Sequence, residues 1–132
     1  MGSSSACFNM EDMNIGEKHT LSHIVSDGET AEVLGSGGLP VYSTPSMICL
    51  MELAAYSLAE RSGHQTVGTK VEISHLRACL PGTEVTAEAE LTDIDGRRLS
   101  YKVTVSDAKG IMGEGRHERF IIDPERFMAK LK

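Results

Sequence analysis

Three side chains in this sequence, Thr44, Glu52 and His75, have types and spacings that could support acid–base or nucleophilic chemistry. Glu52 is the single carboxylate in the apolar stretch Met47–Tyr56, MICLMELAAY. Burying an ionised carboxylate alone is very costly, so Glu52 must be paired, hydrogen-bonded, neutralised or placed at a pocket. An imidazole near such an acid could exchange protons with a reacting group, while the carboxylate attacks, positions water or orients the ring.

Each of these residues also has a purely structural interpretation. Glu52 could cap a neighbour or bond across a subunit interface, His75 could be a satisfied core histidine, and Thr44 could cap a helix. At a helix start, however, a threonine hydroxyl could also help to hold a carbonyl oxygen. Gly68 interrupts a run of β-branched residues, which indicates a bulge or a close approach of a ligand to the backbone. Its N–H is a candidate oxyanion donor, and a packing role is equally compatible with the pattern.

One long helix is predicted to carry both Thr44 and Glu52. Thr44 can cap it, Pro45 suits its first position, and Ser62-Gly63 ends the run after Arg61. This gives about 17 residues, or roughly 25 Å. Because apolar residues cover most of its circumference, we expect the helix to be buried on all sides.

The segments around this helix read as strands. Residues 65–76 alternate as one strand, with His75 on the apolar face and Gly68 on the other. Residues 85–91, 99–105 and about 111–122 predict three more strands, the first two joined by a hairpin at Asp95-Gly96. Before the helix, residues 17–34 predict two short extended pieces around a turn.

These elements predict an α+β protein in which an antiparallel sheet wraps around one long central helix. Part of the helix or the open sheet edge would stay uncovered in a monomer, so we expect a homodimer. With 132 residues in total, we assign residues 15–132 to a single domain. The serine-rich start suggests that residues 1–14 are a disordered or cloning-derived tail.

Composition excludes several classes of function. The net charge of −6 argues against binding nucleic acid or an anionic membrane. No apolar run approaches a membrane span, and three cysteines without a CxxC pattern suggest reduced thiols in the cytoplasm. The histidines lack metal-ligand spacing and no glycine-rich nucleotide motif appears, so we expect neither a metal nor a cofactor.

Four segments together resemble a known family, the fluoroacetyl-CoA thioesterase-like branch of the hotdog-fold thioesterases. They are TPSMICLME (44–52), VGTKVEISH (67–75), DGRRLS (95–100) and GRHER (115–119), and the resemblance extends over about residues 15–130. It implies a hotdog dimer, or a tetramer, that hydrolyses a short-chain acyl-CoA to free acid and CoA. It also implies a catalytic set on Thr44, Glu52 and His75, with the Gly68 N–H at the thioester oxygen.

The segment before Thr44 departs from the family pattern. The fluoroacetate-resistance enzyme has bulky aromatic residues there that form an apolar gate, whereas this chain has GGLPVY (37–42), in which Leu39 or Tyr42 could stand in. We therefore expect a broader or different short-chain substrate. The phosphates of CoA need cations, and the candidates are Arg97, Arg98, Lys102, Arg116 and Arg119. The charged run around His117 is typical of a solvated face.

Two other functions remain open from the sequence. A hotdog hydratase or dehydratase also uses an acid and a histidine on acyl thioesters, but it releases no free thiol. A non-catalytic acyl-CoA-binding protein would bind the same ligand without turning it over. Assaying thiol release distinguishes the thioesterase from both.

Overall fold

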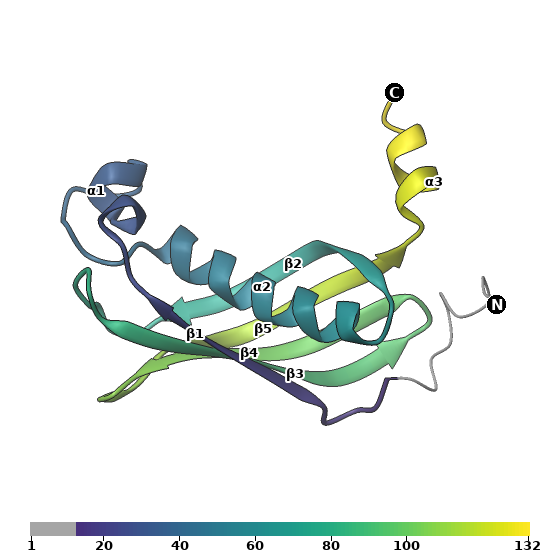
Figure 1. Cartoon of the computed structure of the whole chain (residues 1–132), viewed down its shortest axis with the longest axis horizontal. Helices are drawn as coiled ribbons and strands as arrows, with labels where there is room; N and C mark the ends of the chain where they lie inside the picture. The colour runs from purple at the N-terminus through teal and green to yellow at the C-terminus, as the bar shows by residue number, and fades with distance from the viewer. Residues whose placement is uncertain (1–12) are drawn as a thin grey trace.

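The structure is a computed structural model that describes residues 13–132. Five antiparallel strands form one sheet in the order β1-β3-β4-β5-β2, and helix α2 lies across one face of it (Figure 1). The predicted α+β architecture, an antiparallel sheet around one long helix, is confirmed. In chain order the elements are β1 Lys18–Ile24, the 3-10 turn Asp27–Glu29, α1 Ala31–Leu34, α2 Thr44–Arg61, β2 Gln65–His75, β3 Glu84–Asp95, β4 Arg98–Asp107, β5 Gly110–Ile122 and α3 Pro124–Ala129.

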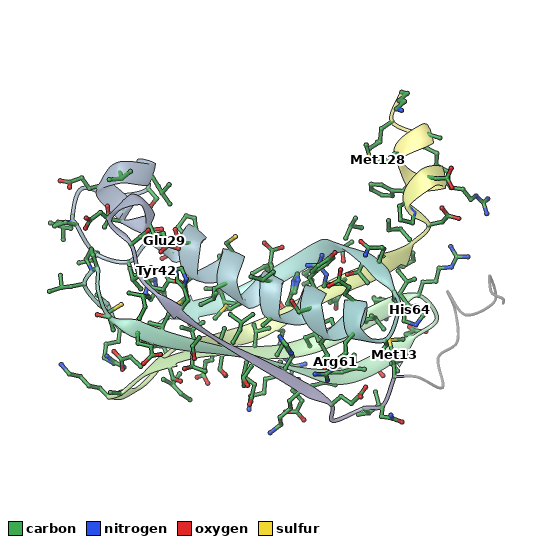
Figure 2. All side chains as sticks on the ribbon, viewed as in Figure 1. Met13, Glu29, Tyr42, Arg61, His64 and Met128 are labelled. Carbon is green, nitrogen blue, oxygen red and sulfur yellow. The ribbon has the colours of Figure 1, made fainter. Side chains whose placement is uncertain are left out.

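The two ends of the described chain differ in their packing. Met13 belongs to the hydrophobic core (Figure 2), while residues 1–12 of the tail predicted at 1–14 lie outside the described residues. At the other end α3 projects away from the sheet, and its Met128 is 51% exposed (Figures 1 and 2). No helix among residues 13–132 is long and apolar enough to cross a membrane.

Helix α2 ends at Arg61 as predicted, but it begins one residue earlier, because its N-cap is Ser43 rather than Thr44. The Ser43 hydroxyl accepts a hydrogen bond from the Ser46 N–H at 3.1 Å, which satisfies one of the free donors at the helix start. Pro45 follows in the first turn, where its missing N–H costs nothing. The hydroxyl of Thr44 is therefore available for another partner.

One face of α2 packs on the sheet and another is exposed. The buried residues recur at helical spacing, and they are Met47, Leu50, Met51, Ala54, Ala55, Leu58 and Ala59. Leu53 is 48% exposed and Cys49 is also exposed, so the prediction of burial on all sides is wrong for a single chain. The sheet side is completed by alternating buried residues of β3 and β4, among them Val85, Ala87, Tyr101 and Val103.

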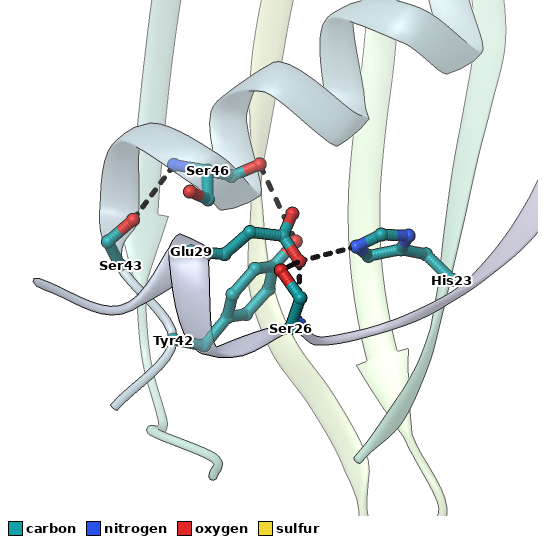
Figure 3. Close-up of polar contacts among 6 residues, drawn as sticks. All are labelled: His23, Ser26, Glu29, Tyr42, Ser43 and Ser46. Carbon is teal, nitrogen blue, oxygen red and sulfur yellow. Dashed lines mark hydrogen bonds and ion pairs between the residues drawn. The ribbon is translucent and has the colours of Figure 1, made fainter. Parts of the chain in front are cut away.

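The segment before α2 is tied down by a polar network around Glu29 (Figure 3). Its Oε1 lies 2.7 Å from His23 Nε2 and accepts from the Ser26 N–H at 2.8 Å, and its carbonyl accepts from the Ser43 N–H at 3.0 Å. Burial would raise the pKa of Glu29, but the hydrogen bonds from Ser26 and His23 hold it below its usual value. These contacts fix the start of α2 and hence the position of Thr44.

Residues 31–34 correct one expectation. The sequence predicts a second extended piece there, and the structure has the short helix α1. Thr30 caps it by accepting from the Val33 N–H, and Gly35 ends it with a φ of 79° that favours glycine. Local capping thus outweighs the loose alternation of apolar residues.

Candidate active site

Thr44 and His75 meet at the start of α2. Thr44 Oγ1 and His75 Nδ1 are 2.7 Å apart, a hydrogen bond whose donor depends on the imidazole tautomer. His75 reaches this position because it ends β2 and is paired with Gly113 of β5. A Cβ on Gly113 would lie 2.5 Å from Met47 Cε, so glycine there lets the first turns of α2 lie close to the sheet.

The pair lines a cavity of about 320 Å³, whose wall also includes Tyr42 and Arg77. Burial lowers the pKa of His75, and a backbone hydrogen bond to Arg77 partly opposes that shift. The imidazole is therefore neutral near pH 7 and able to accept a proton. Its Nε2 is buried and has no hydrogen-bond partner among residues 13–132.

Glu52 lies further along the sheet, against the backbone of Gly68. A Cβ on Gly68 would be 2.8 Å from Glu52 Oε2, closer than real Cβ contacts come. The glycine leaves room for the carboxylate of Glu52 beside the strand, which is the packing role that the sequence pattern allowed. The side chain of Glu52 is half-buried, so it is partly screened from water.

A bulge in β2 puts Gly68 on the same face as His75. Strict alternation predicts opposite faces, but the pairing with β5 shifts at Thr69: Gly68 pairs with Arg119, and Lys70 with Glu118. Because the extra residue reverses the alternation, Gly68 and His75 both face α2. The predicted placement of Gly68 on the outer face is wrong for this reason.

The structure nevertheless keeps Glu52 apart from His75 within one chain. Gly68 and His75 lie near opposite ends of β2, about 20 Å apart along the strand. Thr44 precedes Glu52 on α2 by about 12 Å of helix. One chain thus carries two candidate half-sites: Thr44 with His75, and Glu52 with Gly68.

Two basic residues that the sequence placed on a solvated face lie beside Glu52. His117 is 1% exposed and Arg119 is 7% exposed. Both are close to the position of a Gly68 Cβ, His117 Cε1 at 3.2 Å and Arg119 Nη1 at 3.3 Å. Alternation along β5 from the buried Ile121 would have placed both on the inner face, so a signal for them existed.

The other predicted binding residues are scattered. Tyr42 is buried, and its hydroxyl donates to the Ser46 carbonyl at 3.5 Å. Leu39 is 66% exposed on the loop before α2. Arg119 is turned inward, where its guanidinium donates to Thr66. Among residues 13–132 no three His, Cys, Asp or Glu side chains gather as metal ligands do.

Comparison with known proteins identifies both the architecture and the family. A five-stranded antiparallel sheet folded about one long helix is the hotdog architecture, and a hot-dog-like protein from Thermanaerovibrio acidaminovorans matches it with a TM-score of 0.84 at 20% identity, over 92% of this chain and 93% of that one. The model of the fluoroacetyl-CoA-specific thioesterase (FlK) family matches residues 25–125. The chain belongs to this family.

Individual relatives agree with this assignment. The fluoroacetyl-CoA thioesterase of Streptantibioticus cattleyicolor is 35% identical over 129 residues, which cover 91% of this chain and 93% of the relative. A crystal structure of the fluoroacetyl-CoA thioesterase FlK superposes with a TM-score of 0.83 at 34% identity, over 90% of this chain and 95% of that one. The structure of a thioesterase-superfamily member from Thermus thermophilus superposes with a TM-score of 0.81 at 28% sequence identity. The match covers 89% of this chain and 90% of that one.

Proposed function

We propose that this protein hydrolyses a short-chain acyl-CoA thioester to the free acid and CoA. The observation that carries the proposal is the hydrogen bond between Thr44 and His75 beside a cavity, in a chain that belongs to the fluoroacetyl-CoA-specific thioesterase family. Neutral imidazole, a hydroxyl and a carboxylate are groups that can carry out acyl transfer to water.

In the proposed mechanism Glu52 attacks the thioester carbonyl or removes a proton from the attacking water. The carbonyl oxygen becomes negatively charged and is held by the Thr44 hydroxyl and the Gly68 N–H. The C–S bond then breaks. Neutral His75 takes a proton from the hydrolytic water, directly or through Glu52, and passes it to the departing thiolate of CoA. If Glu52 attacks, one water molecule then cleaves the resulting anhydride, and attack of that water on the glutamate carbonyl places its oxygen in Glu52.

The separation of the two half-sites supports a homodimer as the active unit. Strand β2 pairs only with β5 among the described strands, so its other edge is open. Residues 68–72 in the middle of β2 are exposed. The β2 strands of two copies could pair antiparallel about a two-fold axis near Lys70, and such a pairing is self-complementary. That pairing would bring His75 of one copy close to residues 65–68 of the other. Each site would then combine Thr44 and His75 from one chain with Glu52 and Gly68 from its partner, and a tetramer is not needed.

Mixing two inactive variants tests this composite site. We expect dimers that contain one His75→Ala chain and one Glu52→Gln chain to show about half the wild-type activity, because one of the two sites then has an intact residue from each chain. The measurement is thiol release by heterodimers purified through two different affinity tags. Each homodimer is the control and should be inactive. Heterodimers as inactive as both homodimers would mean that all three catalytic residues act within one chain.

The pH dependence should follow His75. Because burial lowers its pKa below the ordinary value of 6.5, its neutral form persists as the pH falls, and activity that requires the neutral ring is lost only below that value. We expect an NMR titration of the His75 ring to have its midpoint below pH 6.5. The acidic limb of the pH profile of kcat/KM should also not lie above pH 6.5. A ring that titrates at or above its ordinary value would contradict this prediction.

We propose that this protein accepts a broader range of short-chain acyl-CoA substrates than fluoroacetyl-CoA alone. Tyr42 lines the cavity at Thr44 but is fixed in the core by its contact with Ser46, while Leu39 is at the loop surface. These two residues would meet the acyl group from the wall and from the loop, respectively. Leu39 is aliphatic and Tyr42 is held in the core, so they do not reproduce the bulky aromatic residues that the resemblance associates with a gate.

A thiol-release assay with acetyl-, fluoroacetyl-, propionyl- and longer acyl-CoA substrates tests the function. Hydrolysis of a short-chain member that is abolished in Glu52→Gln and His75→Ala supports it. A hydratase or dehydratase would change enoyl or β-hydroxyacyl thioesters without releasing thiol, and a non-catalytic binding protein would bind without turnover. Release of no thiol from any substrate would reject the proposal.

We also propose a cytoplasmic location. The support is chemical: Cys49 and Cys79 carry free thiols, which are typical of a reducing compartment. CoA thioesters, the proposed substrates, carry charged phosphates that need cationic side chains. Trapping the free thiols with a permeable alkylating reagent in intact cells would test whether they are reduced there.

A further inference from the structure

Strand β5 and helix α3 border a cavity of about 440 Å³ that has no role in the proposed mechanism. Helix α3 continues from the end of β5 and projects away from the sheet (Figure 1). The cavity lies at this junction and is lined by three cations, two aromatic rings and one acid, namely Arg97, Arg126, Lys130, Phe120, Phe127 and Asp123. Its volume is that of a small-molecule site. We call it the α3 cavity.

The α3 cavity concentrates positive charge in a chain whose net charge is −6. Its three cations stand against the single carboxylate of Asp123. That carboxylate is engaged in capping α3, because its Oδ1 accepts from the backbone N–H groups of Glu125 at 3.0 Å and of Arg126 at 3.3 Å. A local excess of positive charge attracts an anion even where the whole molecule is acidic.

The other candidate cations for the phosphates of CoA are engaged elsewhere or less concentrated. Arg119 is buried, and Arg98 donates to a neighbouring aspartate at 2.8 Å. Lys102 and Arg116 line a smaller cavity of about 380 Å³, whose wall also includes a glutamate. Arg97, by contrast, shares the α3 cavity with two further cations. The arrangement in space therefore favours Arg97 among the five candidates.

The α3 cavity lies close to the proposed composite site. Its lining includes Val67 and Thr69, the two chain neighbours of Gly68. The start of β2 pairs with the end of β5, immediately before α3. In the proposed dimer His75 of one copy would lie beside residues 65–68 of the other copy, and hence near that copy's α3 cavity. His75 is the residue proposed to protonate the leaving thiolate of CoA, so CoA would depart next to this cavity.

We propose that the α3 cavity binds the nucleotide end of CoA, a 3′-phosphorylated adenosine diphosphate. The inference rests on the proposed function, because it assigns the subsite for the leaving group of that reaction. Arg97, Arg126 and Lys130 would contact the phosphates, since guanidinium groups match phosphate oxygens in charge and geometry. Phe120 is 41% exposed and offers its ring to the adenine, as aromatic side chains do for nucleic-acid bases. The pantetheine arm would connect this subsite to the thioester.

Neutralising the two cations of α3 tests the subsite in the kinetics. Arg126 and Lys130 are exposed, so the double variant Arg126→Gln/Lys130→Gln should fold normally. We expect KM for acyl-CoA to rise by about 10-fold or more with kcat within about twofold, because the lost contacts hold substrate and transition state alike. The matched control, Lys18→Gln/Lys109→Gln, removes the same charge from exposed positions outside the α3 cavity and should leave KM near wild type. An unchanged KM in the α3 variant, or an equal rise in the control, would overturn the inference.

A binding measurement does not depend on turnover. Adenosine 3′,5′-bisphosphate carries the adenine and phosphates but no thioester, and calorimetry reports its affinity directly. We expect it to bind wild type, with Kd about 10-fold or more higher in Arg126→Gln/Lys130→Gln and unchanged in the control. No binding, equal binding to the α3 variant, or pyrophosphate bound as tightly as the nucleotide would overturn the assignment, even if the protein hydrolyses acyl-CoA. If binding weakens as expected while no acyl-CoA releases thiol, the nucleotide subsite holds and the proposed function fails.

Discussion

Replacing Glu52 by Gln should lower kcat for acyl-CoA hydrolysis by about a thousandfold or more, with KM changed only slightly. The amide keeps the size of the side chain and one acceptor oxygen, but it can neither attack a carbonyl nor take a proton from water. The measurement is steady-state thiol release, with single-turnover incorporation of labelled water oxygen into Glu52 to separate direct attack from water activation. We expect a larger effect here than for the second variant below, because the group proposed to react is itself removed.

The matched control is Glu60→Gln, two turns further along α2. Glu60 is exposed and accepts a hydrogen bond from the Tyr56 hydroxyl at 3.1 Å. Its neutralisation should leave kcat within about twofold, as expected for an exposed surface change. If Glu52→Gln retains more than about a tenth of wild-type kcat, then Glu52 is a structural acid, and the sequence interpretation of a bond across an interface becomes the better one.

Gly68→Ala should lower kcat by about a hundredfold with little loss of stability. The added Cβ would lie 2.8 Å from Glu52 Oε2, and the carboxylate, which is the end of a flexible side chain, would swing away. His117 Cε1 at 3.2 Å and Arg119 Nη1 at 3.3 Å would have to give only slightly. Displacement of a reacting group by about 1 Å costs this much. The backbone N–H of residue 68 remains in place, so the variant tests the position of Glu52 rather than the oxyanion donor. Kinetics and thermal unfolding, measured together, check both parts of the prediction.

Gly28→Ala is the control for the added methyl group. Gly28 does not have a positive φ, and its Cβ would meet only Ser26 Oγ at 3.9 Å, an ordinary contact. Activity and melting temperature should both stay near wild type. Unchanged activity in Gly68→Ala would show that Glu52 need not touch this strand, whereas a melting temperature lowered in parallel with kcat would attribute the loss to folding.

Much of the fold follows from local sequence patterns. The bounds of α2, the strands β2 to β5 and the hairpin at Asp95-Gly96 all agree with periodicity, capping and turn signals. These features depend on residues close together in the chain, and their preferences are visible in the sequence. Where two local signals competed, the prediction failed: Ser43 caps α2 although Thr44 is equally suited, and residues 31–34 are helical because Thr30 and Gly35 cap them.

The amino-acid sequence is sufficient to predict the α+β elements and the family, and it singles out Thr44, Glu52 and His75 as residues that need an explanation. Tertiary structure decided how these residues are grouped: a bulge at Thr69 turns Gly68 toward Glu52, and the two half-sites lie near opposite ends of β2. It also decided that Arg119 faces inward. The reason is that strand register and the direction of a buried charge depend on contacts between residues far apart in the chain, which local periodicity does not specify.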